Sequence, residues 1–430
     1  MHRKHGQTGA LVALVTLIAA TSAHAQLEPS PLPPVDPEAV AQVVVKDGSS
    51  TTGPRWYAGE GRFGGDLNGD GLADIVLPGA TDPLLHIFLG SGVFDTAAQV
   101  ELATDGDARL LLPEGCRLGD DRIHWTSAGD LNDDGRDDLA VACFDYLDTT
   151  GTNDLQGAVA IYFGRQSWPA LVTEPDHLVV GDPVIIDSAT LQPIDGTRPG
   201  FSVTGVGDLD GDGDDELLVG GGDVDDPLVP TAWVLLGAPN FETAVTTMGD
   251  AAWTLVGESG AECIAPLMVS ALGDVDGDSV PDLAAGCVAQ NPGFTVDTHY
   301  SVWLGADLLA LPPTINFATR SFQVQPSDQL VPFPSPFTAL GDLDGDGRGE
   351  FAVTSWVDGL SAVSGRVIAG HPAPWDDVGF VDTWWLQNQG TVDPYAAWLP
   401  GGTYESADAL LMAPAGDVDG DGGGDLWVRV

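Results

Sequence analysis

The residues of this sequence that could do chemistry belong to a short acidic loop, which occurs six times. Counted from its first aspartate, positions 1, 3, 5 and 9 always carry a carboxylate or an asparagine, and position 2 is always leucine or valine. Oxygen atoms on alternate residues of a tight loop can converge on one point, which is the ligand chemistry of a hard cation. Positions 1, 3, 5, 7 and 9 are Asp66, Asn68, Asp70, Leu72 and Asp74 in loop 1; Asp130, Asn132, Asp134, Arg136 and Asp138 in loop 2; Asp208, Asp210, Asp212, Asp214 and Glu216 in loop 3; Asp274, Asp276, Asp278, Val280 and Asp282 in loop 4; Asp342, Asp344, Asp346, Arg348 and Glu350 in loop 5; and Asp417, Asp419, Asp421, Gly423 and Asp425 in loop 6.

Calcium is the cation that these loops favour. It takes many oxygen ligands, so a backbone carbonyl at position 7 can add to the side chains. Magnesium keeps more of its water and needs fewer protein ligands, while zinc and copper would need softer donors. Position 6 is glycine in five loops and Ser279 in loop 4, as expected where the backbone turns sharply with positive φ. The sequence therefore predicts about six calcium sites, one in each loop.

Two other interpretations compete with calcium binding. Clusters of Asp, Asn and Gly are common turn formers, but turns alone do not require six copies in the same phase. The helical EF-hand loop needs a bidentate glutamate at position 12. Here position 12 holds Leu77, Val141, Val219, Ala285, Val353 and Val428. An EF-hand, and with it a dockerin-like helical module, is therefore excluded at all six loops.

Short strands must position these loops. The first aspartates of successive loops are 64 to 78 residues apart, so one supersecondary unit is repeated. An apolar run such as 75–77 follows each loop, and a second run that ends in glycine, such as 85–90, follows the first five. Apolar runs bounded by Gly and Asp indicate strands that are buried on both faces. We expect an all-β fold in which each loop joins two strands of a four-stranded sheet, and the sheets form a β-propeller.

The repeat resembles the FG-GAP repeat, which is found in the propeller of integrin α subunits and in many secreted bacterial proteins. The stretch from Phe201 to Gly220, followed by Gly237-Ala238-Pro239, carries the resemblance most clearly, and Phe63-Gly64 precedes loop 1. The resemblance implies a propeller over residues 51–430, with calcium loops on one rim and partners on the other rim or the top face. Integrin-like propellers have seven blades, whereas this chain has six loops, so we expect six or seven four-stranded blades.

The N-terminal residues are predicted to be a cleaved leader and a tether. A basic start, an apolar run and a small-residue site that ends at Ala25 are typical of a secretory signal over residues 1–25. Residues 26–50 form a proline-rich linker. Only the strand after loop 6 remains before the sequence ends, so we expect residues 40–46 to return and complete the last blade. The alternative is that the chain is a fragment.

The composition of the chain indicates which classes of partner are disfavoured. The 64 acidic and 15 basic residues give a formal net charge of −49, which disfavours binding to a phosphate backbone, so we expect no nucleic-acid partner. The hydrophobic content of 43% favours a packed protein over a disordered one. Beyond the leader no apolar stretch reaches about 20 residues, so no membrane span is expected.

The four cysteines are predicted to form two disulfides. Cys143 and Cys287 lie at equivalent places after loops 2 and 4, and Cys116 and Cys263 precede the same loops, which favours the pairs Cys116–Cys143 and Cys263–Cys287. The alternative is four buried free thiols, while zinc binding is disfavoured without Cys-x-x-Cys spacing. Disulfides and a leader together predict a secreted protein, located outside the cell or at its surface.

We expect a calcium-dependent adhesion or recognition module without catalytic activity, with an extracellular protein or glycan as partner. No histidine lies in a nucleophile or metallohydrolase motif. A glycan-binding lectin, a polysaccharide-active enzyme and a structural stalk remain alternatives, because propellers host all of them. Aromatic residues between loops 5 and 6 could stack on sugar rings, anchor a protein or pack between blades. These residues are Trp375, Trp384, Trp385, Tyr395 and Trp398.

Overall fold

The structure is a computed structural model, and almost all of its regular elements are strands. It describes residues 13–15, 44–46, 62–78, 84–90, 99–101, 106–116, 125–147, 156–181, 185–186, 193–195, 197–223, 230–257, 268–290, 296–325, 337–342, 347–357, 362–368, 370, 381–382, 396–399, 412–416 and 425–428. The expected all-β class is therefore correct. Among these residues, no helix has the length and apolar character needed to cross a membrane.

Six sheets of one design follow each other along the chain, and their first strands pair antiparallel with their sequence neighbours. Sheet 1 is β3 (Arg62–Gly65), β4 (Asp74–Pro78), β5 (Leu84–Phe88) and β7 (Ala108–Leu111); sheet 2 is β8 (Trp125–Gly129), β9 (Asp138–Cys143), β10 (Ala158–Tyr162) and β11 (His177–Val180); sheet 3 is β14 (Thr197–Gly207), β15 (Glu216–Asp223), β16 (Pro230–Leu235), β17 (Trp253–Val256) and β21 (Thr314–Asn316). Sheet 4 is β18 (Met268–Gly273), β19 (Asp282–Gln290), β20 (Val296–Trp303), β22 (Phe322–Gln325) and β26 (Val381–Asp382); sheet 5 is β23 (Thr338–Gly341), β24 (Glu350–Val357), β25 (Ala362–Ile368) and β27 (Ala396–Leu399); sheet 6 is β28 (Met412–Gly416), β29 (Asp425–Val428) and β1 (Ala13–Val15).

The acidic loops occupy the same place in every sheet, between its first and second strands. In all six sheets the first strand ends at the glycine before position 1, and the second strand begins at position 9. The pairing of the two strands shifts by one residue just before that glycine, which is a β-bulge. A bulge increases the local twist and re-aims the chain. Each loop therefore leaves its sheet at an equivalent bulge.

The hydrophobic core lies between successive sheets. Along β9, Leu139 and Val141 pack with sheet 1, whereas Ala140 and Ala142 pack with sheet 3. Because alternate residues of a strand point to opposite faces, a strand with a neighbour on each face is apolar throughout. Equivalent clusters join sheets 3 and 4 and sheets 4 and 5. This packing explains the unbroken apolar runs that follow the loops.

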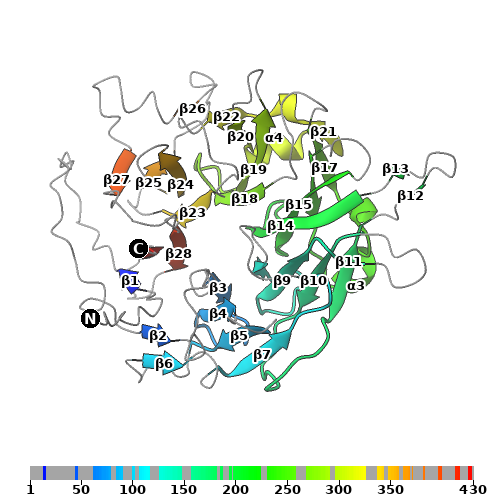
Figure 1. The fold of residues 1–430 in the computed structure, drawn as a ribbon, viewed down its shortest axis with the longest axis vertical. Coiled ribbons are helices and arrows are strands. Elements are labelled where there is room, and N and C mark those ends of the chain that lie inside the picture. Colours follow the sequence, from blue (N-terminus) through cyan, green and yellow to red (C-terminus); the bar gives the residue numbers. More distant parts are fainter. Residues whose placement is uncertain are drawn as a thin grey trace, which may run out of the picture.

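The first strands of the sheets are neighbours around the centre of the view in Figure 1. Strand β3 contacts β8, β8 contacts β14, β14 contacts β18, β18 contacts β23 and β23 contacts β28. Strand β28 in turn contacts β3, so the last sheet lies beside the first. Chain order is thus also the order of the sheets in space.

The outer edge of a sheet is covered by a segment that follows the third strand of the next sheet. Val172 pairs in parallel with Leu110 of β7, and Thr247 pairs in parallel with Val180 of β11. Strand β21 covers β17 in the same way, and β26 covers β22. An exposed strand edge can pair with another chain, so this cover protects sheets 1 to 4 from edge-to-edge association.

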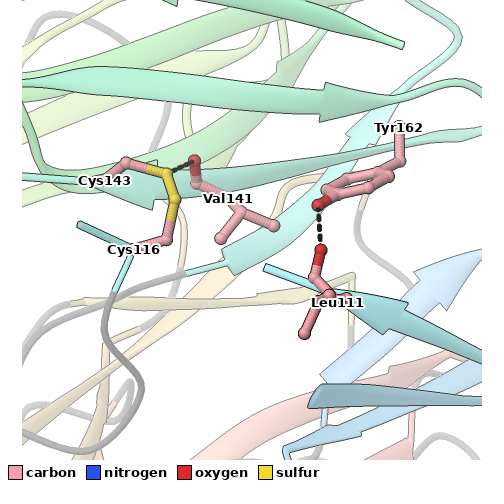
Figure 2. Close-up of a disulfide and its surroundings, with 5 residues drawn as sticks. All are labelled: Leu111, Cys116, Val141, Cys143 and Tyr162. Carbon is pink, nitrogen blue, oxygen red and sulfur yellow. Dashed lines mark hydrogen bonds between the residues drawn. A yellow bond between two sulfur atoms is a disulfide. The ribbon is translucent and has the colours of Figure 1, made fainter. Parts of the chain in front are cut away.

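Sheets 1 and 2 are also joined covalently (Figure 2). Cys116, which follows β7, forms a disulfide with Cys143 at the end of β9. Close by, the hydroxyl of Tyr162 donates a hydrogen bond of 3.1 Å to the carbonyl oxygen of Leu111. The Cys116–Cys143 pairing is the one predicted from the repeat. Cys263 and the side chain of Cys287 lie outside the described residues.

The N-terminal strands differ from the expected arrangement. Residues 44–46 form β2 (Val44–Lys46), which pairs in parallel with β6 (Gln99–Glu101), although residues 40–46 were expected to close the last sheet. The strand that pairs with β29 beside β28 is instead β1, which belongs to the predicted leader. Strand β1 can pair with the edge of β29 that was expected to receive residues 40–46, because strand pairing uses backbone groups. The rest of residues 1–50 lies outside the described residues.

The remaining elements are short. Strands β12 (Ile185–Ile186) and β13 (Pro193–Asp195) pair with each other. The helical segments are α3 (Phe241–Ala244), α4 (Gly305–Leu309) and the 3₁₀ turns η3 (Met248–Asp250) and η4 (Phe317–Thr319). They lie after the third strands of sheets 3 and 4, and the first residue of α4, Gly305, donates its N–H to Asp282 of loop 4.

Candidate metal sites in the acidic loops

The carboxylate of position 1 organises the turn of the loop. In loop 4, the oxygens of Asp274 accept hydrogen bonds from the backbone N–H groups of Gly277, Asp278 and Ser279 at 2.7 to 3.0 Å. Loop 1 repeats all three bonds with its own residues, and loop 2 repeats two of them. The backbone of position 6 has positive φ in each of the five loops where it is described, including 71° at Ser279. The predicted sharp turn is therefore present.

The position 9 side chain is buried at the start of the second strand. Asp74, Asp138, Glu216 and Asp282 have no exposed surface, and Glu350 is 4% exposed. One oxygen of Asp282 accepts the N–H of Val275 at position 2, and the other accepts the N–H of Gly305 after the third strand, both at 2.8 Å. The corresponding bonds of Asp74 and Asp138 measure 2.8 to 3.1 Å. Position 9 thus ties the loop to two strands of its sheet.

Burial makes these position 9 carboxylates unusually reluctant to ionise. Desolvation is the largest cause, and it raises the pKa of Asp138, Glu216 and Asp282 to about 8 and that of Asp74 to about 6. The two backbone N–H groups lower each pKa in part, while the nearby loop aspartates raise it. A divalent cation among these oxygens would stabilise the charged form that burial disfavours.

Loops 3 and 4 bring three acidic side chains close together. The oxygens of Asp208, Asp210 and Glu216 lie within 4.8 Å of one another, and those of Asp274, Asp276 and Asp282 do the same. Calcium binds oxygen at about 2.3 to 2.6 Å, so two ligands of one ion are separated by at most about 5 Å. The three oxygens of each cluster can therefore reach one calcium ion. Positions 1, 3 and 9 are the ones that meet.

The other predicted ligands are placed as follows. The aspartates at position 5 of loops 3 and 4, Asp212 and Asp278, turn one oxygen to the N–H of position 7 in the same loop. Side chains at position 7 vary from exposed Leu72 to buried Asp214, as expected if only the carbonyl is used. Arg136 at this position forms an ion pair of 3.2 Å with Asp134.

Loops 1 and 2 have the same backbone turn as loop 4, with an asparagine at position 3. The side-chain oxygens of Asn68 and Asn132 accept the N–H groups of Asp70 and Asp134, respectively. In loop 5 the structure describes Asp342, Arg348 and Glu350, whereas Asp344 and Asp346 lie outside the described residues. In loop 6 only the backbone of Asp425 is described, so Asp417, Asp419, Asp421 and Gly423 lie outside them, as do Trp375, Trp384, Trp385 and Tyr395.

Two acidic residues at position 8 were not among the predicted site residues. One oxygen of Asp137 in loop 2 accepts the N–H of Asp66 in loop 1 at 2.6 Å, and Asp215 in loop 3 accepts the N–H of Asp130 in loop 2 at 2.8 Å. The sequence signal was a pair of adjacent acids at positions 8 and 9 in only these two loops. Their partners belong to another repeat, so the pattern within one loop could not identify them.

Comparison with known proteins adds little to this picture. No family model matches the chain, and no curated protein matches it. A tail fibre of Staphylococcus aureus phage P68 is similar over 69% of this chain with 7% identity and a TM-score of 0.20. The match spans 65% of the fibre chain, which is just under two thirds of its length. At that TM-score the likeness carries no argument about fold or function.

Proposed function

We propose that this chain is a secreted calcium-binding β-propeller of the FG-GAP type, which serves as a recognition module without catalytic activity. The observation that carries the proposal is the acidic loop itself, which recurs at the same bulged hairpin of six sheets. In loops 3 and 4 its oxygens lie within 4.8 Å of one another, close enough to share one ion.

A propeller of six blades is supported by the order of the first strands. Each contacts the first strand of the next sheet, and β28 contacts β3, which is the contact that a closed ring requires. The hydrophobic clusters between successive sheets also support a radial arrangement, because sheets 2, 3 and 4 each bury both of their faces. Six loops in the sequence and six first strands among the described residues favour six blades over seven.

Calcium fits the loops through the chemistry of their donors. Positions 1, 3, 5 and 9 offer carboxylate and amide oxygens only, which suit a hard cation. When bound, the ion would supply the positive charge that offsets the repulsion between three or four acids of one loop. The residues that would hold it join the first two strands of each sheet, so calcium would stabilise the hairpins on one side of the ring.

The two histidines whose side chains the structure describes both take part in packing. His86 is 3% exposed on β5, within the sheet. The Nε2 atom of His177 lies 2.7 Å from the carbonyl oxygen of Val245, and its ring packs edge-on against Phe241. Both rings are therefore used in packing. Secretion is supported by the Cys116–Cys143 disulfide, since disulfides are typical of oxidising compartments.

Metal content and melting temperature test the proposal. We expect the purified protein to contain several calcium ions per chain and to melt at a much lower temperature after chelation. At calcium ten times above the dissociation constant, each site adds about 1.4 kcal/mol to the free energy of unfolding. An unchanged melt in excess chelator, without bound metal, would contradict the proposal.

A further inference from the structure

Successive loops are connected to each other, in addition to being connected to their own sheets. The N–H of Asp137 donates to the carbonyl oxygen of Asp66 at 3.1 Å, and the carboxylate of Asp137 accepts the N–H of Asp66 at 2.6 Å. Between loops 2 and 3, Asp215 makes the same two bonds to Asp130, at 3.0 and 2.8 Å. Position 8 of one loop thus binds both the N–H and the carbonyl oxygen of position 1 in the preceding loop.

The carbonyl oxygen of position 2 in loops 1 and 2 also accepts a hydrogen bond from the next sheet. The N–H of Arg165 donates to the carbonyl oxygen of Leu67 at 2.8 Å, and the N–H of Ala238 donates to that of Leu131 at 2.9 Å. Positions 1 and 2 of loops 1 and 2 are therefore fixed by residues of the neighbouring repeat. Position 1 is the residue whose carboxylate anchors the turn and contributes to the candidate site.

Glycine before position 1 makes room for this contact. A Cβ atom at Gly65 would lie 2.1 Å from an oxygen of Asp137, and one at Gly129 would lie 2.0 Å from an oxygen of Asp215. Both glycines also have positive φ. The carboxylate of position 8 therefore fits only because the residue before position 1 is glycine, since the Cβ atom of any other residue there would clash with it.

The connection changes along the chain. Position 8 is Pro281 in loop 4, which has neither an N–H nor a carboxylate to offer to loop 3, and it packs beside Gly207 instead. It is Gly349 in loop 5, which keeps the N–H bond to the carbonyl oxygen of Asp274 but has no side chain. Within the described residues, the full pair of bonds joins loop 1 to loop 2 and loop 2 to loop 3.

We propose that Asp137 and Asp215 are positioning residues for the metal sites of the preceding loops, so that loops 1, 2 and 3 bind calcium as a coupled row that ends at Pro281. The proposal rests on the calcium loops of the proposed function. Asp138 is the position 9 ligand of loop 2, and the adjacent Asp137 is bonded to the peptide of Asp66, so a cation held by Asp138 would also restrain position 1 of loop 1. Occupied neighbours therefore favour one another, because each fixes a backbone that the other needs.

The test is a substitution in one loop that weakens the site of another. Asp137→Ala places at position 8 the residue that loop 1 has there, Ala73, and it removes the acceptor for the N–H of Asp66. Asp133→Gly is the matched control, since it removes one charge from the same loop at an exposed position where loops 1, 3 and 4 have glycine. Asp137→Asn keeps an acceptor oxygen without the charge.

Calcium binding to the full chain is measured by titration calorimetry and by the shift in melting temperature, each with and without Asp66→Asn. We expect Asp137→Ala to weaken one site about tenfold, the order of effect of one hydrogen bond to a charged group. In the Asp66→Asn background Asp137→Ala should cause no further weakening. Asp137→Asn should keep most of the calcium affinity that Asp137→Ala loses, and Asp133→Gly should not weaken the site.

Three results overturn the coupling while leaving calcium binding intact. In the first, Asp137→Ala still weakens calcium binding when Asp66→Asn is present. In the second, Asp133→Gly weakens calcium binding as much as Asp137→Ala does. In the third, substitutions on the two sides of Pro281, such as Asp208→Asn and Asp278→Asn, have non-additive effects on calcium affinity. If Asp137→Ala does not fold, Asp215→Ala with Asp130→Asn repeats the test one loop further along. Absence of calcium binding in the unsubstituted chain would instead refute the proposed function.

Discussion

Position 9 holds the fold together with a side chain that could also bind the proposed metal. Its buried carboxylate receives two backbone N–H groups, from position 2 and from the glycine after the third strand. These bonds satisfy both oxygens, yet burial still penalises the charge. The same side chain therefore holds the hairpin in shape and keeps a carboxylate that gains from a nearby cation.

This balance predicts an unusual dependence of stability on pH. In the folded chain the pKa of Asp138, Glu216 and Asp282 is about 8, above the ordinary values of 3.8 and 4.5. The folded state then binds more protons, so the stability these groups contribute is complete below pH 4 and is lost as the pH rises through about 8. We expect the calcium-free melting temperature to fall between pH 5 and pH 8.

Calcium should reverse that trend, because it competes with protons for the same oxygens. The stabilisation by calcium should therefore grow as the pH rises from 5 to 8. Thermal melts of dialysed protein at both pH values, with and without calcium, measure both effects. Asp282→Asn should flatten the calcium-free slope and exposed Asp133→Asn should leave it unchanged; a melting temperature that rises with pH without calcium would contradict the assignment.

A second residue-scale prediction concerns position 6. Ser279 has φ of 71°, in the left-handed region that costs a non-glycine residue about 1 to 2 kcal/mol. Because glycine also loses more entropy on folding, Ser279→Gly should stabilise the chain by a net ~0.5 to 1 kcal/mol. Gly135→Ser, at the same position of loop 2, should destabilise the chain. The amount should be similar, because a Cβ atom there meets nothing within 4 Å and the cost comes from the backbone conformation alone. Urea denaturation measures both, and effects of equal sign would contradict the prediction.

At the scale of elements, sheets 1, 2 and 3 are each joined to the next or preceding one of the three at both ends. On the loop side, position 8 and the residue after the third-strand glycine bind the loop of the preceding sheet. On the outer edge, a parallel segment of the next sheet covers the last strand, as Val172 covers β7. The clusters between the sheets lie between these two connections. Sheets 1 and 2, and sheets 2 and 3, are therefore joined by backbone hydrogen bonds at both ends as well as by packed side chains.

The disulfide between sheets 1 and 2 gives an element-scale prediction. Cys116 and Cys143 are 27 residues apart in the sequence, so the bond restricts the unfolded chain by about 3 kcal/mol in the chain-entropy description. The double substitution Cys116→Ala with Cys143→Ala should lower the free energy of unfolding by about this amount. Tyr162→Phe removes one hydrogen bond between the same sheets and should cost only about 1 kcal/mol. Denaturation in urea compares them, and equal losses would show that the disulfide contributes no cross-linking effect.

At the scale of the whole molecule, the sheets depend on one another. Each described sheet from the second to the fourth buries one face against its predecessor and the other against its successor. A sheet that opened alone would expose both faces and the edges that its neighbours cover. In the proposed closed ring, the contact of β28 with β3 would remove the free end from which such opening begins in a linear array.

We therefore expect the calcium-loaded chain to unfold in one cooperative transition. Scanning calorimetry should give a calorimetric enthalpy close to the van't Hoff enthalpy. Circular dichroism and tryptophan fluorescence should report the same midpoint. Separate transitions for the first and last sheets would mean that the sheets behave as independent repeats.

The sequence by itself determined the parts of this protein that depend on local pattern. Loop spacing and the apolar runs predicted a β fold with acidic hairpins, and equivalent placement in two repeats predicted the Cys116–Cys143 bond. The strands and hairpins could be predicted because strand burial and turn conformation depend on about 15 neighbouring residues. The disulfide joins cysteines 27 residues apart, and it could be predicted because the repeat places its cysteines equivalently in two units.

Only the tertiary structure decided how the repeats meet. The bonds of Asp137 to loop 1, the parallel covers of the outer edges and the partner of β29 all join residues from different repeats. Strand edges and backbone amides accept many partners with the same chemistry, so the sequence does not specify which one is used. Relative placement of the sheets makes that choice, because packing of their side chains brings one backbone rather than another within hydrogen-bond distance.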